Sequence, residues 1–304
     1  MAISKSIKAS HVKGEWQDIV FDYINLFLII VVLLIMLYPL YLVVICSFSD
    51  ANMVSLGQVT LYPKGITFAG YQAMFENRTI WRSYLNSTVY TIVGTLLSVT
   101  ATLGAAFTLS RKFPGRKLIS FIFVFTMFFN GGLIPTFIVM RDIKLYNNPW
   151  ICILMGGISV WNIMVARTYI SSTIPESLYE AAVLDGASKL QYFFRVVMPL
   201  SGTIIAVLSV YYGVDRWNDF WTGLIYISER DYLPLQTVLK DILASLQTRT
   251  DLTNSMLDDA AEAVARAQLA KYCVIVISTL PAIVLYLFMQ KFFVKGVMIG
   301  SIKG

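Results

Sequence analysis

Six long apolar stretches are the feature that most constrains how this chain folds. A helix needs about 20 mostly apolar residues to cross the hydrocarbon core of a bilayer. Only 14% of the 304 residues are charged, whereas a soluble domain carries about 25%. The sequence therefore predicts an all-α integral membrane protein with six transmembrane helices. The predicted spans cover approximately residues 24–45, 84–109, 118–140, 151–170, 200–214 and 272–289.

The distribution of lysine and arginine predicts the orientation of these spans, because short basic loops stay on the cytoplasmic side. The segment RKFPGRK at 111–117 has four basic residues and no acidic one, and the tail 291–304 adds three lysines. The loop 215–271 instead holds nine acidic and six basic residues. We expect both termini inside, a cytoplasmic arm (1–23), a six-helix transmembrane domain (24–290) with its cytoplasmic loop (171–199), and an external loop (215–271).

The composition also narrows the possible chemistry. His11 is the only histidine, and Cys46, Cys152 and Cys273 lack metal or redox spacing. We therefore predict no catalytic residue, no metal ligand and no cofactor in this chain, and we interpret the cysteines as packing residues. The sequence contains no G-x-x-x-x-G-K-[ST] phosphate loop. The net charge of +6 reflects basic inside loops and does not indicate nucleic-acid binding.

The polar loops contain their own helical patterns. A short amphipathic pattern lies around 68–75, and acid-rich helix formers at 258–270 predict a helix that runs into the last span. Between them, an apolar stripe with helical spacing predicts a helix from Leu235 onward. Its members are Leu235, Val238, Leu239, Ile242 and Leu243.

The cytoplasmic segment EAAVLDGASKLQYFFRVVMPL (180–200) predicts a helix, a bend and a second helix. Thr173 with Glu176 forms a capping-box pattern that predicts a helix from Ile174, and Gly186 suits the left-handed turn that ends it. Ser188 with Gln191 forms a second capping-box pattern, which predicts a helix that continues to Pro199.

The first of these helices has an apolar face. Leu178, Ala181, Ala182 and Asp185 share that face, and the two alanines permit close approach of another backbone. Tyr179 and Val183 lie on the adjacent face, so the helix is apolar on two faces. An apolar face on a cytoplasmic loop needs a packing partner. The residues alone leave two alternatives open, a separate protein or the cytoplasmic ends of this chain's own helices.

The spacing Glu180-Ala181-Ala182, three residues, Gly186 and a later proline resembles the EAA loop of binding-protein-dependent ABC importer permeases. This resemblance covers nearly the whole chain from Ile24 onward and implies the type I ABC importer permease fold. In that family the loop forms a coupling helix that docks on a separate ATPase subunit. By resemblance, 174–199 is this loop. Its coupling residues are Glu180, Ala181, Ala182, Leu184, Asp185, Gly186 and Ala187.

Three further segments are similar to the carbohydrate-uptake branch of that family. They are FFNGGLIPTFIV (128–139), WNDFWTGLIYI (217–227) and the C-terminal segment from Gln290. The first resembles permeases for complex oligosaccharides, and the second resembles the segment after the fifth helix in that branch. The third is similar to the tail of the branch's second permease, which is related to the six-helix maltose permease subunit. The resemblance implies a second homologous permease, two ATPase subunits that bind ATP and magnesium, an extracellular binding protein, and a prokaryotic plasma membrane.

Residues for the sugar pathway are predicted from side-chain chemistry, because sugars bind through aromatic stacking and amide or carboxylate hydrogen bonds. Four residues near the predicted pore or its outer mouth have such side chains, with helix capping and tryptophan at the membrane interface as the alternative interpretation for each. These residues are Asn130, Trp217, Asn218 and Asp219.

Two other functions compete with this prediction. One is an ABC permease for a solute other than a sugar. The other is an ion-coupled transporter or channel that acts alone, which commonly carries ionisable residues at mid-membrane depth. The predicted spans are nearly free of such residues, since Arg167 lies near a cytoplasmic end and Asp142 lies outside the third span. The sequence therefore disfavours the ion-coupled transporter.

Overall fold

The computed structural model describes residues 16–253, 269–288 and 290, and all regular elements in these residues are helices. The predicted tail 291–304 and the predicted helix over 258–270, apart from its last two residues, lie outside this part of the chain, as does most of the N-terminal arm. The first helix begins at Trp16, so residues 16–23 of the predicted arm are helical. The helices before the cytoplasmic loop are α1 (Trp16–Ser47), α2 (Ala51–Ser55), α3 (Ala69–Glu76), α4 (Arg78–Ser110), α5 (Arg116–Phe128), α6 (Leu133–Asp142), α7 (Trp150–Leu154) and α8 (Val160–Thr173).

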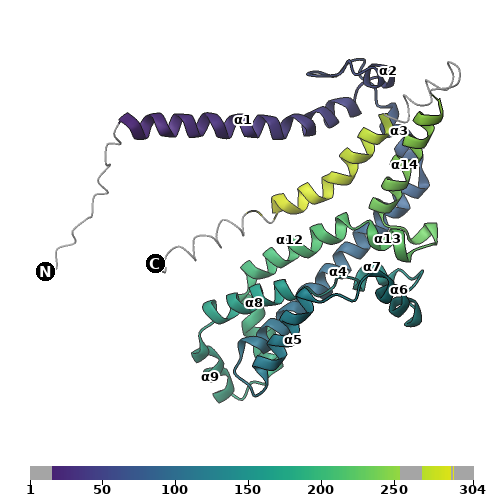
Figure 1. The fold of residues 1–304 in the computed structure, drawn as a ribbon. Coiled ribbons are helices and arrows are strands. Elements are labelled where there is room, and N and C mark those ends of the chain that lie inside the picture. The colour runs from purple at the N-terminus through teal and green to yellow at the C-terminus, as the bar shows by residue number, and fades with distance from the viewer. Residues whose placement is uncertain (1–15, 254–268, 289, 291–304) are drawn as a thin grey trace.

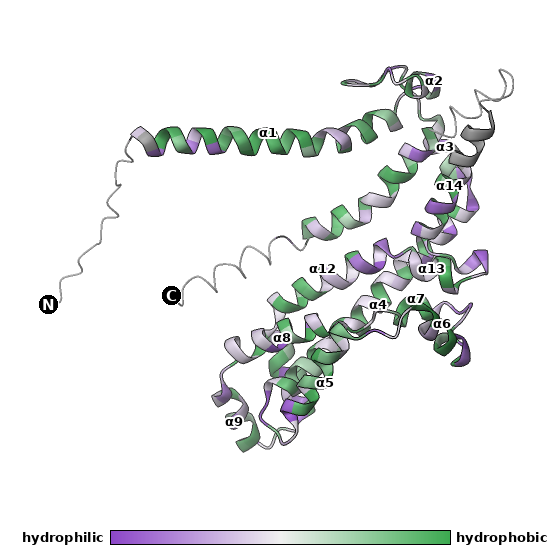
Figure 2. Cartoon of the chain, viewed as in Figure 1, coloured by the Kyte–Doolittle hydropathy of each residue, from purple (hydrophilic) through white to green (hydrophobic). Residues whose placement is uncertain are grey.

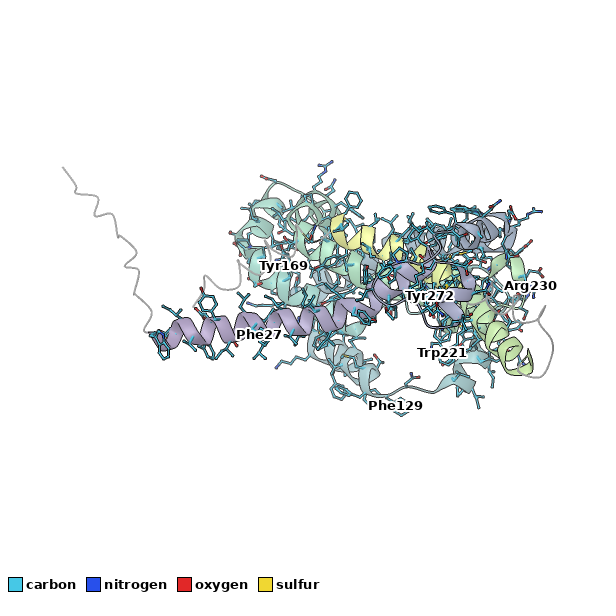
Figure 3. All side chains as sticks on the ribbon, turned by 90° about the horizontal axis from the view of Figure 1, so that it is seen from above. Phe27, Phe129, Tyr169, Trp221, Arg230 and Tyr272 are labelled. Carbon is cyan, nitrogen blue, oxygen red and sulfur yellow. The ribbon has the colours of Figure 1, made fainter. Side chains whose placement is uncertain are left out.

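Helix α1 stands apart from the rest of the chain (Figure 1). It is apolar along nearly its whole length (Figure 2), and only 6% of its most apolar window is buried. In the view from above, side chains around Phe27 project outward from the ribbon (Figure 3). The C-terminal end of α1 contacts other segments through Tyr41, Cys46 and Ser47. The rest of the helix is apolar and exposed, so it needs lipid or another membrane helix around it.

Helix α4 is the centre of the body, and α8 and α12 (Gly202–Asn218) pack along it. Its buried face is rich in small residues near four-residue spacing, which lets neighbouring helices approach closely. These small residues are Ser83, Ser87, Gly94, Ser98, Thr102 and Ala106. Leu103 of α4, Ile163 of α8 and Leu208 of α12 are fully buried in the resulting core.

Glycine-rich breaks divide two of the predicted spans. The third span is α5 and α6, bent by 114° at residues 129–132, where Gly132 has a φ of 86°. The fourth span is α7 and α8, separated by the non-helical segment MGGIS (155–159), where Gly156 has a φ of 66°. The prediction of uninterrupted helices there is wrong, because these glycines adopt left-handed backbone that ends a helix.

The fifth predicted span is longer and more bent than expected. The segment Lys189–Leu200 meets α12 at 82°, and α12 continues to Asn218, beyond the predicted end at Val214. Among the described residues, three helices are long and apolar enough to cross a membrane, or up to five spans if each bent pair counts as one. The count of six and the orientation of the termini therefore stay predictions.

The loops that are predicted to be external pack on the first half of α4. Helix α14 (Leu235–Thr253) begins where the apolar stripe predicted it, and its first amide donates a 2.7 Å hydrogen bond to Ser87 Oγ. The amphipathic pattern near 68–75 is helix α3, which confirms that prediction. Helix α13 (Trp221–Tyr226), the short η2 turn (Arg230–Tyr232) and the last described helix, Leu269–Phe288, complete this end.

Candidate functional site

The loop that is predicted to be cytoplasmic, 171–199, projects from the end of the body opposite α14 (Figure 1). Its first helix is α9 (Glu176–Leu184), which begins two residues later than predicted. Pro175 is the N-cap residue, in extended backbone and without a side-chain hydrogen bond, so the predicted capping box of Thr173 and Glu176 is wrong. The predicted stop is confirmed, since Gly186 has a φ of 76°.

The exposed apolar residues of α9 differ from the predicted face. Ala182 packs against the core of α4, α8 and α12, as does Tyr179. The side chains that face outward are Leu178 (41% exposed), Val183 (52%) and Leu184 (88%). Packing on this chain's own helices therefore holds for one face of α9. The exposed apolar residues are not covered by the part of the chain that the structure describes, and a separate protein there stays a prediction. Glu180, Ala181, Asp185 and Gly186 are also exposed, and Ala187 is half-buried.

The second half of the loop runs back to the body. The capping box of Ser188 and Gln191 is present and opens α10 (Lys189–Tyr192). A π-helical turn, Phe193–Val197, follows and buries the side chains at both of its ends. Pro199 does not stop this segment, because it lies in the first turn of the short α11 (Met198–Leu200), where its missing N–H costs no helical hydrogen bond.

Arg111 connects the end of α4 to this loop. Its guanidinium carbon lies 4.3 Å from the ring centroid of Tyr179 on α9 and 5.4 Å from that of Tyr192 on α10. The same guanidinium carbon lies 5.3 Å from the ring centroid of Phe107, and Arg111 Nη2 donates a 3.4 Å hydrogen bond to Tyr192 Oη. Arginines over ring faces within about 6 Å are attracted by cation–π interactions. Arg111 belongs to the basic segment 111–117, and it also attaches α9 and α10 to the end of α4.

The four predicted pathway residues each have a structural contact. Asn130 Oδ1 accepts the amide of Gly132 (3.0 Å) at the α5–α6 break. Trp217 is buried, and its Nε1 donates to the Ser278 carbonyl at 2.9 Å. Asn218 donates to the Val214 carbonyl, and Asp219 accepts the Thr222 amide and hydroxyl at the start of α13.

These contacts do not gather the four residues into one site. Asn130 contacts the α5–α6 break, whereas the other three residues contact α12, the last helix and the start of α13. Asn130 and Asn218 are exposed, whereas Trp217 is directed into the packing against the last helix. A role in the sugar pathway stays a prediction for all four, and the capping and packing roles are the ones for which the structure provides contacts.

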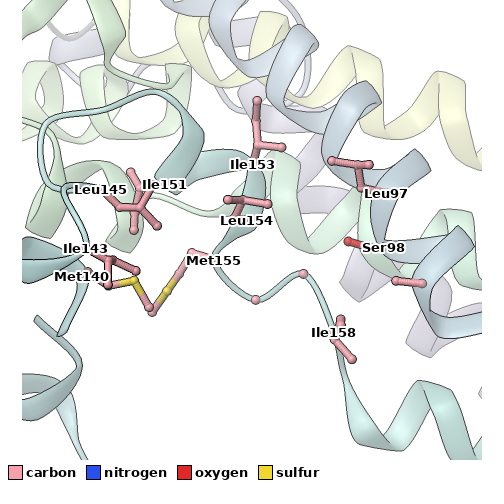
Figure 4. A pocket seen from close by; sticks show the side chains of 13 residues that line it. Leu97, Ser98, Met140, Ile143, Leu145, Ile151, Ile153, Leu154, Met155 and Ile158 are labelled. Carbon is pink, nitrogen blue, oxygen red and sulfur yellow. The ribbon is translucent and has the colours of Figure 1, made fainter. Parts of the chain in front are cut away.

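A cavity of about 450 Å³ lies beside the break between α7 and α8. Figure 4 shows Met140 and Met155 close together on one side and Ser98 of α4 on the other. Aliphatic side chains and methionines dominate the lining, with one side-chain hydroxyl, that of Ser98. This lining lacks the convergent hydrogen-bonding groups that orient a polar ligand in a pocket.

The sequence analysis did not single out Arg216, which lies within α12. Its Nη1 donates to the carbonyls of Cys152 (2.7 Å) and Ile153 (2.6 Å), and its Nη2 donates to Ser98 Oγ (3.0 Å). The statement that the spans are nearly free of ionisable groups therefore needs correction. An arginine directly after the apolar run 200–214 was the available signal, because an ionisable residue within a membrane helix commonly has a function.

The described residues contain no group of three or more side chains with metal-ligand chemistry. The three cysteines are buried, and they are free.

Comparisons with known proteins agree on one family. Residues 94–299 match the family model described as "Binding-protein-dependent transport system inner membrane component". Protein LplC of Bacillus subtilis (strain 168) is 34% identical over 286 residues, 94% of this chain and 95% of LplC. The polygalacturonan/rhamnogalacturonan transport system permease protein YtcP of the same organism is 34% identical over 272 residues, 89% of this chain and 94% of YtcP.

A solved structure is similar along nearly the whole chain. It is the crystal structure of a bacterial ABC transporter involved in the import of the acidic polysaccharide alginate. One of its chains superimposes with a TM-score of 0.82 at 31% identity, covering 92% of this chain and 99% of that chain. The bent and broken helices described above therefore form a type I ABC permease fold.

Proposed function

The chain belongs to the family of binding-protein-dependent transport system inner membrane components, and from this premise we propose that it is the permease subunit of an ATP-driven oligosaccharide importer. Members of this family are transport subunits without an ATPase site of their own. The chain would lie in the plasma membrane of a prokaryote as a multi-pass protein. The observation that carries the proposal is the exposed apolar surface of α9, at the tip of a loop that is itself fixed to the core.

This apolar surface is the proposed contact with the ATPase. Leu184, at 88% exposure, stands at the C-terminal end of α9 beside the left-handed turn at Gly186. When an apolar side chain enters a cleft of a partner, the complex is stabilised in proportion to the apolar area removed from water. Glu180 is exposed on the same helix and would face a basic group of that partner. ATP and magnesium would bind only to the ATPase subunits.

The substrate is proposed to be an acidic oligosaccharide delivered by an extracellular binding protein. Two similar proteins support this substrate class, since the printed names associate YtcP with polygalacturonan and rhamnogalacturonan and the solved transporter with alginate. An ABC permease for a non-sugar solute has no comparable support. A transporter that works alone is disfavoured by the family itself.

A second homologous permease is proposed to complete the pathway. Helix α1 has an apolar surface on all sides, and only 6% of its most apolar window is buried. Such a helix can pack against a neighbouring subunit with lipid on its other side. The outer loop over 229–270, which includes α14, would face the binding protein.

Uptake assays in cells that carry the complete transporter test this function. Gly186→Val places a β-branched residue at a φ of 76°, which such residues avoid, and Glu180→Lys reverses an exposed charge. Each is expected to abolish uptake while membrane insertion is retained. Lys189→Ala, on the same loop, is the matched control and should transport normally. Normal uptake in both loop variants contradicts the proposal. Purification of this chain's complex without any bound ATPase also contradicts it.

The substrate is tested with defined sugars. Uptake of radiolabelled trigalacturonate should exceed that of neutral maltotriose, and it should stop when ATP is depleted. Faster uptake of maltotriose than of trigalacturonate would mean that the substrate is a neutral oligosaccharide and not an acidic one. Uptake of neither sugar, but of an amino acid or peptide, would support the alternative solute. Transport driven by an ion gradient without ATP would contradict the ATP-driven mechanism altogether.

A further inference from the structure

A polar cluster crosses the core of this chain at the break in the fourth apolar stretch. We call it the interlock, and it consists of Ser98 and Thr102 on α4, Tyr212 and Arg216 on α12, and the backbone on both sides of the break at 155–159. Ser98 and Thr102 are four residues apart on α4, and so are Tyr212 and Arg216 on α12. Residues at this spacing share one helix face, so the two pairs form a two-rung contact between the helices.

The first rung holds the end of α7. Arg216 Nη1 donates to the Cys152 and Ile153 carbonyls at 2.7 and 2.6 Å, and Nη2 donates to Ser98 Oγ at 3.0 Å. The last carbonyls of a helix lack helical partners and carry partial negative charge, which a cation stabilises. The only ion pair between described residues is elsewhere, between Arg141 and Asp142. The carbonyl end of α7 therefore helps to balance the charge of Arg216, together with the nearby carboxylates of Asp215 and Asp219.

The second rung holds the start of α8. Tyr212 Oη accepts the backbone N–H of Ser159, the N-cap residue of α8, at 3.1 Å, and it pairs with Thr102 Oγ1 at 2.7 Å. Thr102 is fully buried and Tyr212 is 4% exposed. One helix, α12, thus binds the backbone on both sides of the same break.

Gly94 provides the space that Arg216 occupies. A Cβ atom added to Gly94 would collide with the Nε, Cζ and Cδ atoms of Arg216. Gly94 lies four residues before Ser98 on the same face of α4. An alanine at position 94 would therefore displace the guanidinium without removing its charge.

The interlock lies between the coupling loop and the outer loops. The chain enters the loop from α8 and leaves it into α12. Both of these helices take part in the interlock, α12 through Tyr212 and Arg216 and α8 through the amide of Ser159. Just before α7, the Asn147 amide donates to the Tyr226 carbonyl at 2.8 Å. Asn147 Oδ1 accepts the amides of Ser228 (3.1 Å) and Glu229 (2.9 Å).

We propose that Arg216 is a positioning residue for transport: the interlock makes α7, α8 and α12 move as one body across the break, so that a displacement of the coupling loop reaches the outer loop at 226–229. This inference rests on the proposed function, since it assumes that the loop is displaced by an ATPase. Without the interlock, the glycines of the break would bend and absorb the displacement.

Labelling of the native Cys152 tests the interlock directly. Cys152 is 7% exposed and its carbonyl is one of the acceptors of Arg216. In the assembled transporter with Cys46 and Cys273 changed to alanine, N-ethylmaleimide should label Cys152 slowly, both without nucleotide and after vanadate trapping. Arg216→Met should increase the rate at least about tenfold, as expected for local opening, and Arg216→Lys should give a smaller increase.

Two results of this labelling would overturn the proposal. Fast labelling of the parent protein after vanadate trapping would mean that the break opens as a hinge during the cycle. Equal labelling of the parent protein and Arg216→Met would mean that Arg216 does not hold α7. Arg141→Met removes a surface arginine whose side chain is 59% exposed, and this matched control should label like the parent.

A double-mutant comparison separates positioning from general stability. Basal ATP hydrolysis and its stimulation by the binding protein with trigalacturonate are measured in nanodiscs. Gly94→Ala and Arg216→Met should each retain basal hydrolysis and lose most of the stimulation. Gly94→Ala added to Arg216→Met should cause no further loss, because no guanidinium remains to be displaced. Additive losses, or full stimulation in Arg216→Met, contradict the proposal.

The labelling result distinguishes this proposal from the proposed function. If the wild-type complex hydrolyses ATP but neither imports sugar nor responds to the binding protein, the proposed function fails, and the labelling still decides whether Arg216 holds α7. If the wild-type complex imports sugar and Arg216→Met imports it equally well, the interlock proposal alone fails.

Discussion

Two arginines attach other segments to α4, and they do so by different physical means. Arg216 reaches the middle of α4 and forms three hydrogen bonds of 2.6–3.0 Å, two of them to backbone carbonyls. Arg111 follows the end of α4 and lies over the rings of Phe107, Tyr179 and Tyr192, with one longer hydrogen bond of 3.4 Å.

The difference concerns how much movement each contact tolerates. Hydrogen bonds weaken steeply as the angle at the hydrogen departs from linearity, so the Arg216 contacts fix the register of α7 and α12. A cation over a ring is attracted throughout a region within about 6 Å of the centroid. The Arg111 contact therefore allows α9 to tilt while it stays attached. A rigid contact in the core and an adaptable contact at the proposed coupling helix suit a lever that is moved from one end.

Replacing each arginine by methionine should give the largest difference in unfolding free energy between the two contacts. Arg216→Met leaves two carbonyls and the Ser98 hydroxyl without their donor, and the loss of hydrogen bonds from a charged donor should cost about 1.5–3 kcal/mol of unfolding free energy. Arg111→Met should cost about 1 kcal/mol or less, because the lost cation–π contact is partly replaced by contact of sulfur with the rings. Titration with SDS in mixed micelles measures both values.

Arg141→Met, which removes an exposed arginine paired with Asp142, is the control for this comparison. It should change the unfolding free energy by less than about 0.5 kcal/mol, as substitutions on the surface commonly do. Equal costs for Arg216→Met and Arg111→Met would remove the distinction between a rigid and an adaptable contact.

Replacement by lysine should sharpen the comparison in the uptake assay. Lysine retains the charge and can still lie over a ring, but its single ammonium cannot reproduce the planar fork of arginine. Arg216→Lys should therefore lower the rate of uptake by about tenfold, equivalent to about 1.4 kcal/mol, and Arg111→Lys by less than about twofold. Both chains must be present in the membrane at equal amounts. A larger loss of uptake in Arg111→Lys than in Arg216→Lys would mean that Arg111 forms the rigid contact and Arg216 the adaptable one.

The local features of the fold were predictable from sequence, and the interlock was not. Gly186, the capping box of Ser188 and the apolar stripe from Leu235 each depend on residues within one or two helical turns, where spacing determines structure. Arg216 depends on acceptors at positions 98, 152 and 153. No local pattern brings these positions together.

The breaks were missed for a related reason. Hydropathy averages over a window, and the glycines at 131–132 and 156–157 do not lower that average enough to divide a span. Their effect lies in the left-handed backbone of Gly132 and Gly156, which residue type permits but does not require. Pathway residues such as Trp217 were selected by side-chain chemistry, and the structure directs that indole to the Ser278 carbonyl in the packing of the last helix.

The smallest expected effect comes from removing one hydroxyl on each side of the comparison. Tyr212→Phe loses the buried bonds to Thr102 and to the Ser159 amide, which should cost about 1–2 kcal/mol of unfolding free energy and loosen the start of α8. Tyr179→Phe keeps the ring face that Arg111 contacts and should be neutral within about 0.5 kcal/mol. SDS titration of the two variants side by side measures this difference, with hydrogen exchange at the start of α8 as the local readout. A neutral Tyr212→Phe would mean that Arg216 alone holds the break, and the second rung would then have no part in transmitting motion from the coupling loop.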